Sequence, residues 1–376
     1  MKKSFSQVLT RKGTEEKTWE EKIATAQCDV FHTPEYMAAF EMCPPSEAST
    51  NFGGEACLFV FGDEDDFIVH PFFKRDLAKL PFYSSVLQKE FPLYDIASPY
   101  GYAGPVAHVT HPDLHESLWK RFLIEFHEFC IRSNIVTEFV RLNPFLKNHE
   151  SLSKVAEGVR KSGVVIYIDL TAEEDVIWKN MKKPNRNSIT RAKRENVDIS
   201  RTKSLEDINE FVKMYNETME RRNAKKIYYF PNKFYHLLFD MLKENASLFV
   251  ARHEGEIVSG SLFIGRGTLI HYFLSGTRLE ARSPGATNLL LYEAVMWAKK
   301  QGYKVFDFGG GYAVNDSLFQ FKASFSKTTA DFFTYRKVHD ESKYRILSEA
   351  IDKYHREHKP SEVPPAQSDY FPYYRR

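Results

Sequence analysis

The sequence predicts an α/β (α+β) protein built from two domains of like topology, and three observations support this fold class. The chain has 376 residues, enough for about two domains with separate cores. Hydrophobic residues make up 43% of it and aromatic residues 15%, which is a globular composition. A weak internal repeat aligns residues 58–73 with residues 248–263 at a constant offset of 190.

The repeat predicts the same order of elements in both halves of the chain. In each copy two apolar runs flank a short charged turn, which predicts a β-hairpin. A short amphipathic helix precedes each hairpin, and a further helix that leads into a strand follows it. The order helix, hairpin, further strand, helix, strand therefore occurs twice. The flanking segments are 31–40, 114–134 and 135–142 in the first copy, and 230–239, 288–302 and 303–309 in the second.

This order places a domain boundary near Gly163. We expect an N-terminal domain over residues 1–163, a C-terminal domain over 164–340, and a helix with an aromatic tail over 341–376. The tail is rich in proline and aromatic residues, so we expect it to pack back in an extended form or to contact a second subunit.

Charge and cysteine content exclude several classes of protein. The formal net charge is +2, which argues against a protein that coats nucleic acid. The four cysteines form no Cys-x-x-Cys pair, which predicts reduced thiols in a cytoplasmic protein. No apolar run approaches the roughly 18 residues that span a bilayer, and charges interrupt the N-terminus before a signal peptide can form. His108, His111 and His115 have metal-like spacing, but Pro112 interrupts them, so we expect no metal.

Residues 275–288 join a predicted strand to a predicted helix and form the first candidate site. Small residues with Pro284 and Gly285 at a helix N-terminus leave backbone N–H groups for a pyrophosphate or carboxylate, and Arg282 adds a full charge. Ala286 and Thr287 complete this candidate donor-binding loop. The alternative is an ordinary strand-to-helix connection, in which Pro and Gly only form the turn between the two elements.

The second candidate site combines a glycine turn with a lysine among aromatic residues. Gly309 and Gly310, in a run of three glycines after a strand, let backbone approach a ligand closely. No Gly-Lys-Ser/Thr follows, which excludes a P-loop, and no Gly-x-Ser-x-Gly elbow indicates an α/β-hydrolase. Lys322 lies between Phe321 and Phe325, a setting that orients an ammonium toward a phosphate or an oxyanion and lowers its pKa. The alternative is a lysine that snorkels over an aromatic core.

Residues 179–226 are strongly basic, with 14 Lys and Arg against 7 Asp and Glu, a net charge of +7. Such a stripe suits an anionic substrate: a tRNA backbone, the phosphates of CoA or a nucleotide-linked precursor. Arg186 and Arg191, near the opening of a predicted helix, are the better candidates for contact. A solvated helix face is the alternative.

Four segments in order resemble the FemAB-like branch of the GNAT superfamily. They are His32–Tyr36, Ser98–Pro105, Asp307–Gly311 and the pair Phe321-Lys322, within roughly residues 25–340. The branch includes peptidoglycan bridge-forming aminoacyltransferases and related acetyltransferases. The resemblance implies tandem GNAT-like domains with mixed sheets flanked by helices. It further implies that the co-substrate is acyl-CoA or aminoacyl-tRNA and that no cofactor is tightly bound. It also implies that Phe321 and Lys322 engage the donor and stabilise the transition state.

We therefore expect an N-acyltransferase that transfers an acyl or aminoacyl group to an amine of a cell-envelope precursor. Asp307 or Asp316 is the candidate base, and each is equally suited to capping a loop. The expected partners are a nucleotide-linked precursor, a tRNA and, through a lipid-linked acceptor, the membrane surface. A non-catalytic module that binds nucleotide-sugars or RNA is the alternative. The candidate acceptor-binding residues, which also suit simple packing, are Tyr100, Tyr102, Arg186, Arg222 and Tyr272.

Overall fold

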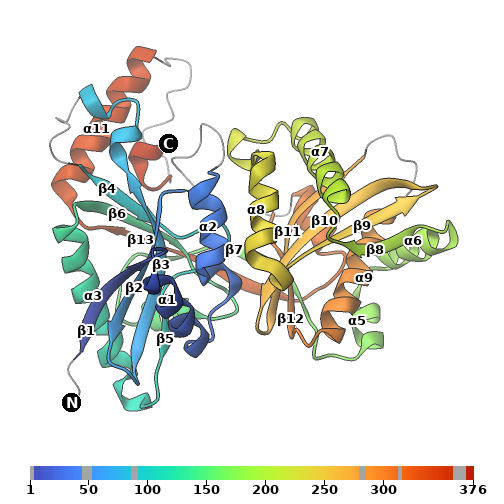
Figure 1. Cartoon of the computed structure of the whole chain (residues 1–376), viewed down its shortest axis with the longest axis horizontal. Coiled ribbons are helices and arrows are strands. Elements are labelled where there is room, and N and C mark those ends of the chain that lie inside the picture. The colour runs from blue at the N-terminus through green and yellow to red at the C-terminus, as the bar shows by residue number, and fades with distance from the viewer. Residues whose placement is uncertain (1–3, 45–52, 86–91, 279–284, 312–315, 359–369) are drawn as a thin grey trace. The chain divides into compact units, whose positions relative to one another are not determined.

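The computed structural model describes residues 4–44, 53–85, 92–278, 285–311, 316–358 and 370–376 (Figure 1). Within it the chain forms two compact units. Unit 1 comprises Met1–Lys161 together with Phe333–Arg376, and unit 2 comprises Ser162–Phe332. The chain therefore enters unit 2 once, leaves it once and finishes in unit 1.

Unit 1 contains a mixed sheet in the order β1-β2-β3-β4-β6-β13, with β5 paired to β3. The pair β4 and β6 is parallel, and the other pairs are antiparallel. The predicted first hairpin is confirmed as β2–β3, closed by Gly62 against Phe67. The strands are β1 (Phe5–Thr10), β2 (Glu55–Gly62), β3 (Phe67–Asp76), β4 (Tyr94–Ala97), β5 (Val106–His108), β6 (Ile135–Arg141) and β13 (Thr329–Val338).

Helices cover both faces of this sheet because its strands are apolar on both sides. Phe59 and Phe72 pack against α3, while Phe73, the neighbour of Phe72 in sequence, contacts Phe40 of α2 on the opposite face. The Thr33 hydroxyl caps α2 by accepting from the Tyr36 N–H. The helices of unit 1 are α1 (Thr14–Thr25), α2 (Pro34–Met42), α3 (His115–Arg132), α4 (Asn148–Leu152) and α11 (Glu341–His358).

The strands of unit 2 follow one another in the order β7-β12-β11-β10-β9-β8. The pair β11 and β12 is parallel, and the others are antiparallel. The predicted second hairpin is confirmed as β9–β10. The strands are β7 (Val159–Asp169), β8 (Asp198–Thr202), β9 (Ala246–His253), β10 (Glu256–Arg266), β11 (Leu269–Thr277) and β12 (Val305–Gly309).

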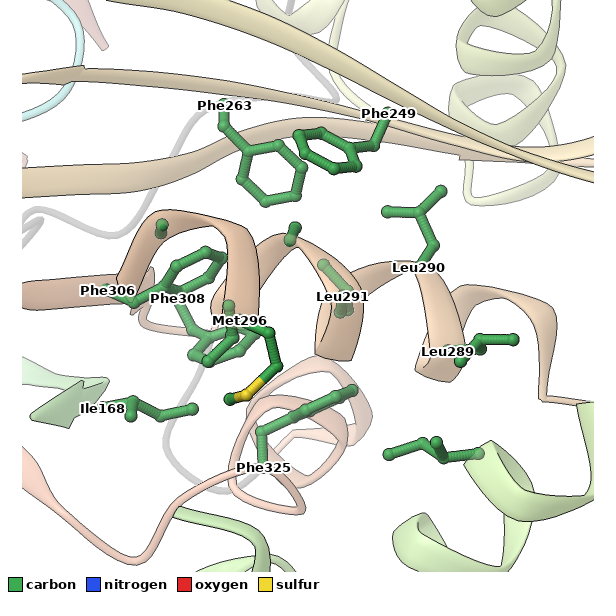
Figure 2. Close-up of a cluster of buried hydrophobic side chains, with 14 of the residues drawn as sticks. Ile168, Phe249, Phe263, Leu289, Leu290, Leu291, Met296, Phe306, Phe308 and Phe325 are labelled. Carbon is green, nitrogen blue, oxygen red and sulfur yellow. The ribbon is translucent and has the colours of Figure 1, made fainter. Parts of the chain in front are cut away.

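Two cores, one on each face, hold the helices of unit 2. Figure 2 shows α9 against β9, β10 and β12, with Leu290, Phe249 and Phe306 in one apolar cluster. On the other face α7 lies close to β11 at Gly276, where a Cβ would be only 2.6 Å from the Tyr215 nitrogen. The absence of a side chain at Gly276 permits this close approach. The helices are α5 (Glu174–Asn180), α6 (Lys183–Arg194), α7 (Leu205–Arg221), α8 (Asn232–Leu242), α9 (Ala286–Lys300) and α10 (Ser317–Lys322).

The units correct the domain limits expected from the sequence. The first limit falls at residues 161/162, close to the expected Gly163, but residues 333–340 group with unit 1 and not with the second domain. The reason is the pairing of Thr334–Val338 in β13 with Thr137–Arg141 in β6. Residues 341–376 also join unit 1, where Leu347 and Tyr374 share a core with Val136. The C-terminal helix and tail are therefore part of the first unit.

The predicted fold class, α/β units with mixed sheets flanked by helices, is confirmed. In the part of the chain that the structure describes, no helix is long and apolar enough to cross a membrane.

Candidate functional site

Lys322 lies in the interior of unit 2, at the end of α10, with 8% of its surface exposed. The Asp316 carboxylate caps α10 by accepting from the Phe319 N–H at 2.7 Å. This cap holds the short helix in place, and Lys322 Nζ donates to the Gly310 carbonyl at 2.6 Å. The same ammonium lies 5.9 Å from the centre of the Tyr272 ring. The structure therefore brings Lys322 to the glycine turn that the sequence singled out.

The buried position changes the acid–base behaviour of Lys322. Burial lowers the pKa of its ammonium from 10.5 to about 8, because desolvation disfavours the charged form. The negative charges of Asp307 and Asp316 act in the opposite direction and favour the ammonium. A lysine of this kind is cationic at neutral pH and loses its charge within a moderately alkaline range.

Asp307 is buried and both of its oxygens are engaged. Oδ1 accepts from the Gly309 N–H at 2.7 Å, and Oδ2 lies 2.9 Å from Nδ1 of His271. Because an ionised carboxylate only accepts hydrogen bonds, the Nδ1–H of His271 is the donor. Of the two roles that the sequence left open for Asp307, this geometry matches the loop-capping role.

The glycine turn is crowded rather than open. Gly309 has φ +71°, a left-handed conformation that favours glycine. A Cβ at Gly310 would lie 2.9 Å from the Val164 carbonyl, and one at Gly311 would lie 2.5 Å from Asp316 Oδ1. The turn therefore needs glycines for its own packing. Within this packed turn the Gly310 carbonyl faces Lys322.

Gly285 directly precedes α9, and its φ of +92° requires glycine. A Cβ at this position would lie 2.3 Å from the Ser188 carbonyl oxygen in α6. Next to it Ala286 is buried, and the Thr287 hydroxyl lies 2.9 Å from that of Ser259. The start of α9 is therefore packed against α6 and β10. Arg282, the remaining member of the candidate donor loop, lies outside the described residues.

Tyr272 is the candidate residue that approaches Lys322 from another element of unit 2. The Tyr272 ring, on β11, faces the ammonium, and burial raises the pKa of its hydroxyl while Ser275, Ser261 and Arg222 favour the ionised form. Arg222, at the end of α7, is exposed but near enough to exert this effect. Phe321 packs edge-on against Phe325 at 5.5 Å, on the aromatic side of α10.

The basic stripe is partly neutralised by its own surroundings. Arg191 is exposed and pairs with Glu195 at 2.7 Å, and Lys193 pairs with Glu293 at 2.9 Å. Arg186 donates to the backbone carbonyls of Lys179 and Met181, so it stabilises the turn before α6. The two arginines that the sequence favoured therefore have structural partners at the end of α5, directly after it, and directly after α6.

Tyr100 and Tyr102 belong to unit 1, after β4. The backbone carbonyl of Tyr100 accepts from the buried Tyr36 hydroxyl at 2.6 Å. The Tyr102 ring packs edge-on against Phe31 at 5.8 Å. Both tyrosines are only partly buried.

His271 is the residue that sequence reasoning missed. It lies in β11 as one of a run of apolar and aromatic residues, and its partner Asp307 is 36 positions away. The sequence offered one signal: each of two neighbouring strands, β11 and β12, carries a polar residue among apolar ones, His271 in the first and Asp307 in the second. No group of acidic, histidine and cysteine residues suited to a metal ion occurs among the described residues, and His111 instead binds Asp66 at 2.7 Å.

Two sequence comparisons relate part of this chain to known proteins. Residues 179–322 match the model of an Acetyltransferase (GNAT) domain, and the match ends at Lys322. A UDP-N-acetylmuramoylpentapeptide-lysine N(6)-alanyltransferase from Weissella viridescens is 27% identical over 146 residues. That stretch covers 38% of this chain and 42% of the relative, so the match spans less than half of the relative's length.

A crystal structure of FemX has the same fold as this chain. The TM-score is 0.60 at 14% identity, and the match covers 83% of this chain and 97% of that one. The matching segment of unit 2 is therefore a GNAT acyltransferase domain. The resemblance to the FemAB-like branch of the GNAT superfamily is confirmed.

Proposed function

We propose that this chain is an N-acyltransferase that transfers an acyl or aminoacyl group to an amine of a cell-envelope precursor. The observation that carries the proposal is the buried Lys322, held by the Gly310 carbonyl beneath the Tyr272 ring within a GNAT domain. The relative from Weissella is named as an alanyltransferase acting on a UDP-linked muramoyl pentapeptide. That name supports an envelope precursor, peptidoglycan or polysaccharide, as the acceptor.

Attack of a neutral amine on a thioester or ester makes a tetrahedral centre whose oxygen is negatively charged. An ammonium that is already oriented and shielded from water stabilises this charge more strongly than water does. Lys322 is cationic at neutral pH and fixed by one hydrogen bond, so we assign it this role. Removal of a single donor of this kind costs about 100- to 1,000-fold in kcat.

For the other candidates we propose binding roles. Backbone N–H groups at the start of α9 suit the phosphates of a donor, and Phe321 suits its acyl end. Tyr272, which lies beside Lys322, and Arg222, whose charge acts on Tyr272, suit an anionic acceptor. Asp316 is the remaining candidate base, and Tyr100 and Tyr102 are the acceptor-binding candidates in unit 1. The donor-binding set is Arg282, Gly285, Ala286, Thr287, Gly309 and Gly310.

The donor is either acyl-CoA or aminoacyl-tRNA, and no metal or tightly bound cofactor is part of the proposal. Lys183 and Arg194 of α6 are exposed and suit a polyanion. Since both donors are intracellular, we propose a cytoplasmic protein that reaches the membrane surface only through a lipid-linked acceptor. Binding of tRNA weakens steeply with salt, whereas binding of a small CoA ligand weakens less.

The experiment is a transfer assay with radiolabelled acetyl-CoA and radiolabelled alanyl-tRNA, using a UDP-linked muramoyl pentapeptide as acceptor, at two salt concentrations. Lys322→Ala should lose at least 100-fold in kcat while its circular dichroism and melting temperature stay near those of the wild type. The matched control is Lys327→Ala, an exposed lysine after the same helix, which should leave the rate unchanged. Ligand-induced thermal stabilisation without any transfer would instead favour the non-catalytic binding module.

A further inference from the structure

The parallel strands β11 and β12 separate at one particular pair of residues. Their register runs Leu269 with Val305, Ile270 with Phe306, and His271 with Asp307, and it ends there. β11 continues to Thr277, while β12 ends at Gly309 after an irregularity between Asp307 and Gly309. The fork between the two strands therefore begins at His271 and Asp307.

The side chains of this last pair are joined by a buried hydrogen bond. His271 Nδ1 lies 2.9 Å from Asp307 Oδ2, with exposed fractions of 2% for both residues. Asp307 extends the link along its own strand, because its other oxygen accepts from the Gly309 N–H. The next residue, Gly310, supplies the carbonyl that binds Lys322. Three hydrogen bonds, joined through the backbone of Gly309 and Gly310, thus connect β11 to the Lys322 ammonium.

We propose that His271 and Asp307 form a positioning pair that fixes the Gly309–Gly310 turn at the fork between β11 and β12 and so sets the place of the Lys322 ammonium. The inference rests on the proposed function in so far as Lys322 acts in acyl transfer. Neither residue of the pair is assigned contact with substrate. Asp307 thereby acts through the turn rather than as the base considered for it from the sequence.

The pair also has an electrostatic consequence that a purely structural contact would lack. Among the described residues, the charged and titratable groups that act on Lys322 are Asp307 on β12, Asp316 before α10, and Tyr272 on β11. His271 is bonded to Asp307, and the charge of Arg222 acts on Tyr272. Burial disfavours the ammonium and the Asp307 carboxylate favours it. Loss of this carboxylate should therefore lower the pKa of Lys322, whereas loss of a merely structural contact should not.

Asp307→Asn removes the charge and keeps the size of the side chain. His271→Leu removes the donor, while His271→Asn keeps an N–H near the position of Nδ1. We expect Asp307→Asn to lower the Lys322 pKa by about one pH unit or more. We expect His271→Leu to reduce kcat at least 10-fold with a smaller change in KM, and His271→Asn to restore most of that loss. The control, Asp240→Asn, changes an exposed carboxylate of the same unit and should alter neither quantity.

The Lys322 pKa is measured by NMR titration of the protein labelled with ¹³Cε-lysine, with the signal assigned by its absence in Lys322→Arg. This readout needs no turnover, so it tests the pair even if every donor and acceptor proves inactive and the proposed function fails. An unchanged Lys322 pKa in a folded Asp307→Asn protein would overturn the inference. So would equal loss of kcat in folded His271→Asn and His271→Leu proteins.

Discussion

The guanidinium of Arg375 binds the carboxylate of Asp95 in the interior of unit 1, with Nε 2.5 Å from Oδ2 and Nη2 2.9 Å from Oδ1. Arg75 reaches the same carboxylate from β3 at 2.8 Å, and the Tyr374 hydroxyl lies 3.2 Å from it. Burial raises the pKa of Asp95, but the charges of Arg375 and Arg75 outweigh it and lower the pKa. The last residues of the chain are thus part of the core of unit 1.

Arg375→Ala should destabilise unit 1. Removal of one partner of a buried ion pair typically costs about 3 to 5 kcal/mol, and Arg75 remains to offset part of this here. The measurement is urea unfolding followed by circular dichroism. Arg345→Ala, which removes an exposed arginine of α11, should change the free energy of unfolding by less than about 0.5 kcal/mol. Equal stability of the two variants would show that the Asp95 cluster does not hold the C-terminal segment.

Gly285→Ala should destabilise unit 2 for two reasons: the new Cβ would clash with the Ser188 backbone, and the backbone at this position would be strained. Gly255 is a matched control, since its φ of +85° is close to the +92° of Gly285, but nothing lies within 4 Å of a Cβ there. Strain at a left-handed residue costs about 1 kcal/mol, and it is common to both variants. The excess loss of stability in Gly285→Ala, read from melting temperatures, measures the contact with Ser188. Equal melting temperatures of the two variants would contradict the prediction and show that α6 shifts to accommodate the new Cβ.

The hairpins β2–β3 and β9–β10 could be predicted because their apolar runs and turn residues are adjacent in sequence. The same local pattern located Lys322 next to its aromatic neighbours. The pairing of β13 with β6 could not be predicted from the sequence. It joins residues nearly two hundred positions apart, and the sequence of β13 continues without interruption from unit 2. The bond between His271 and Asp307 was missed although Asp307 alone was a candidate, because only the strand register brings the two residues together.

Glu138 should make unit 1 sensitive to acid. Burial raises the pKa of this carboxyl, but hydrogen bonds from His339 and His70 lower it to about 2. Since the unfolded chain has a pKa near 4.3, the folded state gains stability above that value and loses it as the pH falls toward 2. The stability difference between wild type and Glu138→Gln should therefore shrink from pH 5 to pH 2. Unfolding at graded pH measures it, with exposed Glu349→Gln as the control. A constant difference would contradict the prediction.

Lys322 should impose an alkaline limit on acyl transfer. Its folded pKa of about 8 lies below the 10.5 of an unperturbed lysine, so the cation that stabilises the oxyanion disappears as the pH rises through 8. Deprotonation of the acceptor amine raises the rate over the same range, so a profile of the wild type alone mixes two effects. Lys322→Arg keeps its charge at all these pH values and serves as the reference. The ratio of kcat/KM in the wild type to that in Lys322→Arg should fall about tenfold for each pH unit above 8. A ratio that rises through pH 8 would identify neutral Lys322 as the proton acceptor instead.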